Sequence, residues 1–164
     1  DSLTVVRSEE LMERSKQEEE FRKQYEEQER YNLTAANDAV ASGIIFHRPT
    51  RGMISSKFDA HKKHYGIDIA ATPKESVLAT LDGTVILSTY TAETGYVIQI
   101  QHGQNLVSVY KHCGSLLKKA GDTVKAGEAI ALVGNTGEKT TGPHLHFELW
   151  NKGRALDPVK YIVF

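Results

Sequence analysis

Charged and apolar residues follow one pattern in the first quarter of the chain and a different one afterwards. Residues 8–36 are rich in charge, and their few apolar residues are too sparse for the seam of a coiled coil. Acidic residues repeatedly stand four positions before basic ones, as Glu10 does before Arg14, an order that stabilises a helix. This segment is therefore predicted to form a solvated helix with Ser8 as its N-cap, within a helical stalk or linker over residues 1–43.

From residue 44 to residue 164, short apolar runs alternate with turn residues, which is typical of β-strands. The predicted strands cover residues 44–46, 76–79, 84–88, 96–102, 106–112, 128–133, 145–150 and 154–156, with one helical turn over 115–119. Asp82-Gly83 indicates a hairpin between the second and third of these strands. Two similar turn-strand units, over 81–85 and 121–128, indicate a duplicated motif. The expected fold class is mainly β, a compact antiparallel barrel or sandwich behind a charged α-helix.

Composition excludes several classes of protein. The formal net charge is only −1, although residues 1–38 hold eleven acidic and six basic residues. Aromatic residues are not interleaved with Lys/Arg runs, so no nucleic-acid partner is expected. No apolar run approaches the length of a membrane span. The single Cys113 excludes an intramolecular disulfide. Because the chain begins at Asp1 with neither Met nor a signal-peptide pattern, we expect a membrane anchor upstream of it.

The candidate chemistry centres on a short segment near the C-terminus, Gly-Pro-His-Leu-His-Phe-Glu at residues 142–148. Side chains of a strand alternate faces with a period of two, so His144 and His146 project from the same face. They lie roughly 6–7 Å apart at ~3.3 Å of rise per residue. Such a pair can share one metal, or place one imidazole on the metal and the other on its substrate. Glu148 is expected to orient a neighbouring group rather than to act as a base.

Further candidate ligands come from earlier segments. His64 and Asp68 stand four residues apart around Gly66, which favours a loop that feeds a strand and lets the two side chains converge. Catalytic zinc commonly takes three His or Asp/Glu ligands, and His64, Asp68 and one histidine of the 144/146 pair make such a set. The other histidine and His112 would then lie beside the zinc-activated water, where an imidazole can accept a proton or stabilise an oxyanion. This inventory fits metal-assisted amide hydrolysis.

These segments resemble the lysostaphin-like, LytM-type family of peptidoglycan zinc metalloendopeptidases. The similarity covers about residues 44–164 and lies in several spaced motifs that occur in the same order. These motifs are His64-x-x-x-Asp68, Tyr110-x-His112, Gly134-Asn135-Thr136-Gly137 and His144-Leu145-His146-Phe147-Glu148. One segment departs from the family, because Asp59-Ala60-His61 lacks the Gly and Arg that often follow Ser-x-Phe in active members.

The resemblance implies a role for each matching residue. His64, Asp68 and His146 match the zinc ligands of the family, and His144 matches its general base. His112 matches the histidine that polarises water or holds the oxyanion. The implied fold is a compact antiparallel barrel or sandwich, with the metal in a groove walled by loops. The implied substrates are the peptide stems or cross-links of bacterial peptidoglycan, and the implied location is the periplasm or the exposed cell envelope.

Two functions of other classes compete with this interpretation. A non-catalytic LytM-type module would regulate another cell-wall hydrolase, but such relatives typically have substituted ligands, and none is substituted here. A biotinyl or lipoyl carrier domain is suggested by the half-motif at residues 121–128, yet it needs a lysine at a hairpin tip, usually between Met residues, and Met53 is far from any such tip. A thiol protease built on Cys113 and His112 is disfavoured because adjacent residues of a strand point apart. We therefore expect a zinc metalloendopeptidase.

Overall fold

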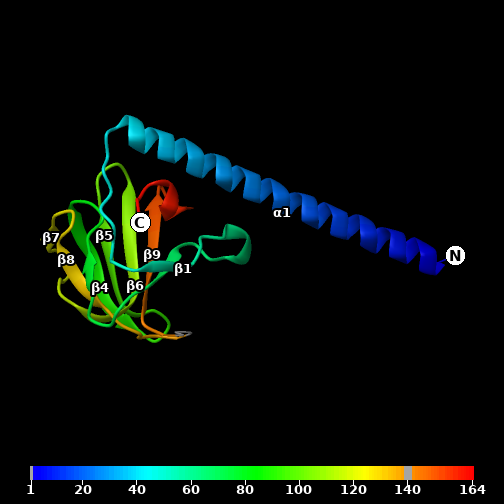
Figure 1. Ribbon diagram of the computed structural model, residues 1–164. Coiled ribbons are helices and arrows are strands. Elements are labelled where there is room, and N and C mark those ends of the chain that lie inside the picture. Colours follow the sequence, from blue (N-terminus) through cyan, green and yellow to red (C-terminus); the bar gives the residue numbers. More distant parts are fainter. Residues whose placement is uncertain (1, 139–141) are drawn as a thin grey trace.

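The computed structural model describes residues 2–138 and 142–164 and joins one long helix to an antiparallel sheet (Figure 1). We call residues 44–164 the β region. In chain order the elements are α1 (Ser2–Ala41), β1 (Met53–Ser56), η1 (Ala60–Lys62), β2 (Ile67–Ala70), β3 (Ser76–Leu78), β4 (Gly83–Thr91), β5 (Gly95–Gln101), β6 (Leu106–Leu116), β7 (Thr123–Val124), β8 (Ala129–Val133), β9 (His144–Asn151), β10 (Arg154–Leu156) and η2 (Pro158–Lys160).

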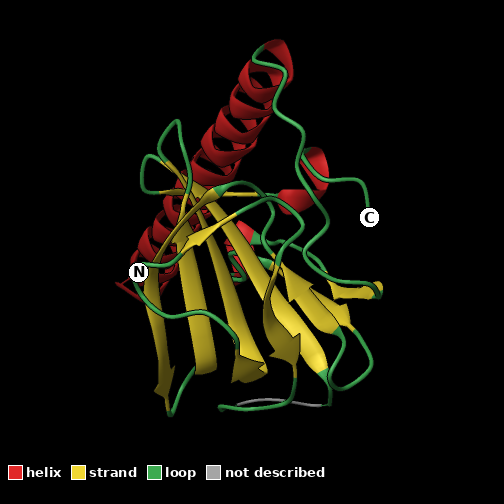
Figure 2. Ribbon diagram, turned by 90° about the vertical axis from the view of Figure 1, so that its left-hand side faces the viewer, coloured by secondary structure: helices red, strands yellow, loops and turns green. Residues whose placement is uncertain are grey.

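Ten strands form one open, branched sheet. Its main path runs in the order β1-β2-β9-β6-β5-β4-β7, while β10 pairs with β9, and β8 pairs with both β3 and β6. All of these pairs are antiparallel. Figure 2 shows the strands side by side, joined by short loops. The expected class, a mainly β fold behind an N-terminal helix, is confirmed, and the sheet is close to the barrel or sandwich that we expected, although it does not close.

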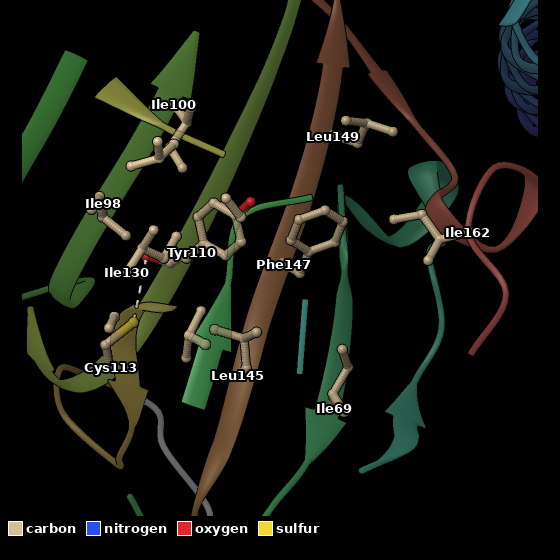
Figure 3. Close-up of a cluster of buried hydrophobic side chains, with 14 of the residues drawn as sticks. Ile69, Ile98, Ile100, Tyr110, Cys113, Ile130, Leu145, Phe147, Leu149 and Ile162 are labelled. Carbon is tan, nitrogen blue, oxygen red and sulfur yellow. Dashed lines mark hydrogen bonds between the residues drawn. The ribbon is translucent and has the colours of Figure 1, made fainter. Parts of the chain in front are cut away.

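Alternation along the strands builds the hydrophobic core. Leu145, Phe147 and Leu149 of β9 are fully buried, as are Ile67 and Ile69 of β2. Figure 3 shows the side chains of β9 in one cluster with isoleucines of β5 and with residues of β6 and β8. Burying one side chain of this size is worth about 1.5–3 kcal/mol. The core therefore fixes the register of β2 and β9, and with it the side chains that project between the buried ones.

Several local elements differ from the prediction, which did not include β1 and β7. The helix begins at Ser2 rather than at Ser8 and continues to Ala41. Residues 44–46 form no strand and have no ladder partner, and the next residue, His47, donates its N–H to the Thr80 carbonyl oxygen. The helical turn predicted over residues 115–119 is absent from this described segment, where β6 continues to Leu116 and pairs with β8. Pairing with β8 overrides the weak local signal for a helical turn at residues 115–119.

The predicted hairpin at Asp82-Gly83 is wrong. β3 pairs with β8, whereas β4 pairs with β5 and β7. Gly83 serves a close approach between strands instead, since a Cβ at this position would stand 2.4 Å from the carbonyl oxygen of Gln101.

The helix contacts the β region mainly through its C-terminal part. The Tyr31 hydroxyl donates to the backbone oxygen of Asn151 at 2.8 Å, and the fully buried Asn32 accepts from the backbone N–H of Asp157 at 2.9 Å. Lys160 of η2 pairs with Glu29 at 2.6 Å. The N-terminal part of α1 extends away from the sheet (Figure 1). Within residues 2–138 and 142–164, no helix is both long enough and apolar enough to cross a membrane.

Candidate active site

Three of the predicted ligands meet where β2 lies beside β9. Asp68 and His146 are direct cross-strand partners, and the His146 Nδ1 lies 2.7 Å from Asp68 Oδ1. His64 enters from the turn that follows η1, and its Nε2 lies 3.4 Å from Asp68 Oδ2. One donor atom from each of the three residues lies within 4.8 Å of the other two. The structure therefore assembles His64, Asp68 and His146 into one candidate metal centre.

The second nitrogen of each ring fixes how these imidazoles face the centre. His64 Nδ1 lies 2.6 Å from the carbonyl oxygen of Lys57, and His146 Nε2 lies 2.8 Å from Glu148 Oε2. Carbonyl and carboxylate oxygens only accept hydrogen bonds, so these nitrogens carry the hydrogen in the neutral rings. The other nitrogens then present lone pairs to Asp68. A hydrogen on His146 Nδ1, or a cation between the two groups, accounts for the 2.7 Å approach to Asp68 Oδ1. Two imidazoles with one carboxylate suit a catalytic zinc.

Asp68 and Glu148 surround His146 with negative charge, which shifts the pKa values of the centre. Burial alone would raise the pKa of Asp68, but the hydrogen bond and charge of His146 outweigh it and lower that pKa. Burial alone would lower the pKa of His146, but its hydrogen bonds to Asp68 and Glu148 outweigh it and raise that pKa. A divalent cation is favoured by the same carboxylates.

The other two predicted histidines form a pair on the far side of His146. The ring centroids of His112 and His144 lie 5.3 Å apart, and the ring centroids of His112 and His146 lie 6.3 Å apart. Their Nδ1 atoms lie 2.7 Å from the Thr136 carbonyl oxygen and 2.8 Å from that of Gly142. In the neutral form, both rings therefore carry hydrogen at Nδ1 and a lone pair at Nε2.

Two features of His112 favour a role in the site. Burial lowers its pKa, which favours the neutral ring at pH 7. Its backbone has a φ of 62°, in the left-handed region, and its N–H donates to the Thr94 carbonyl oxygen at 2.8 Å. Such a conformation costs on the order of 1–3 kcal/mol and is common at functional sites. The neighbouring Cys113 is fully buried in the core, as the alternation argument against a thiol protease expects.

A cavity of about 390 Å³ holds all five predicted residues. Its walls also carry five further charged side chains from the surrounding loops and strands, namely Lys63, Glu93, Lys111, Glu138 and Glu148. A second cavity of about 440 Å³ shares Asp68 and His144 with the first and is otherwise lined by small or uncharged residues, among them Ser55 and Ser56. The two cavities therefore adjoin each other at Asp68 and His144.

Sequence reasoning missed the groups that hold the site residues in place. The carbonyl oxygens of Lys57, Thr136 and Gly142 cannot be found from side-chain motifs. The period of two along β9 does, however, place Glu148 and Trp150 on the face of the two histidines, and the expectation that Glu148 orients a neighbour agrees with its contact to His146.

The family model of peptidase family M23 matches residues 62–158, more than half of the chain and the whole of the site. The chain belongs to peptidase family M23. Peptidases of this family are zinc-dependent, and the family agrees with the resemblance drawn from the motifs.

Curated relatives support this assignment. An uncharacterized metalloprotease of Haemophilus influenzae is 40% identical over 116 residues, which are 65% of this chain and 24% of that protein. The murein hydrolase activator NlpD of Escherichia coli is 37% identical over 117 residues, 70% of this chain and 30% of that protein. The peptidoglycan DD-endopeptidase ShyA of Vibrio cholerae is 36% identical over 116 residues, 65% of this chain and 27% of that protein.

Among solved structures, a zinc-containing peptidase from Vibrio cholerae superimposes with a TM-score of 0.66 at 34% identity. The superposition covers 70% of this chain and 39% of that one. This chain matches between 24% and 30% of the length of the three curated relatives above, so they share one region with it rather than their whole architecture.

Proposed function

We propose that this chain is a zinc metalloendopeptidase that hydrolyses the peptide stems or cross-links of bacterial peptidoglycan. One observation carries the proposal: His64 Nε2, the Asp68 carboxylate and His146 Nδ1 converge within 4.8 Å of one another. Membership of family M23 supports the class of reaction. The relative named as a peptidoglycan DD-endopeptidase supports the substrate.

His64, Asp68 and His146 would hold the zinc ion. Bound zinc supplies Lewis acidity, which lowers the pKa of water and polarises a carbonyl group. The remaining chemistry belongs to the His112 and His144 pair, because neither ring is needed to complete the three-ligand set.

His144 would act as the general base. Its Nδ1–H donates to the Gly142 carbonyl oxygen, so its neutral Nε2 is free to accept a proton from the attacking water and to return it to the leaving amine. His112 would orient that water, because its lowered pKa and its Nδ1–H bond to Thr136 leave a lone pair, rather than an N–H, at Nε2. Of the two roles implied by the family, polarising water fits this ring better than holding an oxyanion.

The setting of the enzyme is part of the proposal. Residues 1–43 would form a helical stalk or linker, residues 44–164 the metallopeptidase domain, and a segment upstream of the chain would anchor it in the membrane. The names of two relatives, the murein hydrolase activator and an outer membrane antigenic lipoprotein of Haemophilus influenzae, support a location in the cell envelope, periplasmic or exposed.

Digestion of purified peptidoglycan tests the proposal directly. The zinc-loaded chain should release fragments whose masses show hydrolysis of a peptide bond, and EDTA should abolish their release. The fragment masses would also identify the bond. Fragments formed equally well by the Asp68→Ala variant would contradict the proposal, since that variant lacks the carboxylate at the centre.

A second candidate is a non-catalytic module that regulates another cell-wall hydrolase. The 37% identity to a murein hydrolase activator favours it. The complete donor set favours the enzyme, because a regulator has no need of three converging ligands. Absence of fragments from the chain alone, combined with faster digestion when a peptidoglycan amidase is added, would establish the regulator instead.

A further inference from the structure

A buried carboxylate lies directly behind the candidate metal centre. Glu148 is 7% exposed and lies on β9, two residues after His146. Its Oε2 is 2.8 Å from His146 Nε2 and 3.0 Å from Lys111 Nζ, and its Oε1 accepts from Trp150 Nε1 at 2.9 Å. Three donors from two strands therefore surround one carboxylate.

The contacts of Glu148 fix which nitrogen of His146 carries a hydrogen. Lys111 and Trp150 both donate to Glu148, so its two oxygens act as acceptors. The oxygen that accepts from Lys111 also faces His146 Nε2 at 2.8 Å, so this nitrogen donates to it. The only tautomer of neutral His146 that meets this demand leaves the lone pair at Nδ1, which faces Asp68.

The loop that carries His64 closes tightly over the same groups. A Cβ on Gly66 would stand 2.3 Å from the Phe147 carbonyl oxygen, 2.8 Å from Glu148 Cγ and 3.1 Å from His146 Cε1. Only glycine lets this loop approach so closely. Glu148 is thus held from three directions, by Lys111, by Trp150 and by the backbone at Gly66.

We infer that Glu148 is a positioning residue that locks His146 in the Nδ1-acceptor tautomer, and that Lys111 and Trp150 hold Glu148 in place for this task. The inference rests on the proposed role of His146 as a metal ligand. A partner that orients the second nitrogen of a metal-bound histidine typically contributes a factor of about 10 to 100 in metal affinity. Glu148 itself is not a ligand, because donors already engage both of its oxygens.

The test is the zinc affinity of the intact chain, measured without substrate by competition with a fluorescent chelator. Glu148→Gln keeps the size of the side chain but offers one acceptor oxygen to three donors. We expect it to weaken zinc binding by about 10- to 100-fold. Glu93→Gln is the matched control, since Glu93 lines the same cavity on the β4–β5 turn and is not among the hydrogen-bond partners of His146.

A second variant covers the case in which Glu148→Gln fails to fold. Trp150→Phe removes one donor and leaves the Glu148–His146 contact, so we expect a loss of affinity smaller than that of Glu148→Gln. At saturating zinc, both variants should regain most of their kcat, because a positioning residue acts through the metal ligand. Loss of kcat at saturating zinc with unchanged affinity would overturn the inference and make Glu148 catalytic.

The outcomes separate this inference from the proposed function. Zinc affinity that is unchanged in both variants but lost in His146→Ala overturns the inference and leaves the metal centre standing. Weakened affinity in Glu148→Gln supports the inference even if no peptidoglycan is cleaved. Absence of zinc binding by the unaltered chain overturns both.

Discussion

The β region and helix α1 differ in how their residues are held in place. Asp68 and His146 are 78 positions apart in sequence, yet β-ladder pairing and a buried core fix them side by side. In α1, residues 8–27 are exposed throughout, and hydrogen bonds and an ion pair to the β region come from residues 28–32. Phe21 and Tyr25 add only edge contacts to the ring of His61.

The two regions therefore have different roles: the β region carries the groups proposed for metal binding and catalysis, and α1 only attaches to it. Every group proposed to act on substrate lies in the β region and is held by contacts between distant segments. In the helix, residues 28–32 are bound to the β region, and residues 8–27 are exposed to solvent. Changes at the site in the β region should therefore alter metal binding and catalysis. Changes in α1 should alter only the stability of its contact with the β region, or have no measurable effect.

The largest effect is expected from His146→Ala. This change removes the lone pair at Nδ1 and leaves the Glu148 carboxylate without one of its donors. We expect loss of stoichiometric zinc, measured by atomic emission after dialysis, and no measurable cleavage. His47→Ala, which removes an exposed histidine outside the site, is the control and should behave like the unaltered chain. Full zinc occupancy in His146→Ala would contradict the ligand assignment.

His144→Ala should separate the two halves of the site. The three-ligand set stays intact, so we expect zinc binding to be kept. Loss of the general base should lower kcat by about 10²- to 10⁴-fold. Steady-state kinetics on a defined peptidoglycan peptide measures the fall in kcat, and the zinc content of the same sample shows whether the metal is kept. Normal kcat would exclude His144 as the base.

Asn32→Ala should affect stability without affecting chemistry. The change leaves the backbone N–H of Asp157 without its partner in a partly buried position, which costs up to about 1–3 kcal/mol. Urea unfolding, with hydrogen exchange of α1 as the local readout, measures the effect, and Asn37→Ala, at an exposed position of the same helix, is the control. A large fall in kcat would show that docking of the helix reaches the site.

Acid should weaken the β region through His102. This ring is 4% exposed, between the Asp82 carbonyl oxygen and the Ser108 hydroxyl, and burial lowers its pKa below the ordinary 6.5. The unfolded chain then binds the proton first, so this contribution to stability is complete above pH 6.5 and is lost as the pH falls through the folded-state pKa.

We expect the loss through His102 to be smaller than that in Asn32→Ala, because the Ser108 oxygen can still accept a hydrogen bond from the charged ring. Comparing unfolding at pH 7.5 and pH 5 in the unaltered chain and in His102→Gln measures it. An identical pH dependence in the two proteins would exclude His102 as the source.

The smallest effect is expected from deleting residues 1–27. The deletion leaves residues 28–32, which bind the β region, in place. Changes at exposed positions usually alter the free energy of unfolding by less than about 0.5 kcal/mol. Zinc affinity and kcat should stay unchanged. A substantial loss of either would mean that the Phe21 and Tyr25 contacts to His61 support the turn that carries His64.

The five candidate site residues could be found from the sequence because they lie in strong local patterns. The period of two along β9 placed His144 and His146 on one face, and Gly66 correctly predicted a loop that brings His64 towards Asp68. Pairing between distant segments was harder to predict. The Asp82-Gly83 signal indicated a hairpin, but its flanking strands pair with β5, β7 and β8.

Two further features depend on tertiary structure and leave little trace in local sequence. The left-handed backbone of His112 is stabilised by Thr94 and Thr136, which come from other loops. The docking of α1 depends on a few polar residues, such as Asn32, within a helix that otherwise reads as fully solvated.

The most direct test of the account is a zinc titration of the chelator-stripped chain, with cleavage of a defined peptidoglycan peptide as the readout. The account predicts that cleavage rises linearly with added zinc and levels off at one zinc per chain, and that the His144→Ala protein binds the same single zinc with almost no cleavage. Full cleavage by the stripped protein before zinc is added, or one bound zinc per chain with no cleavage of any peptidoglycan peptide, would contradict it.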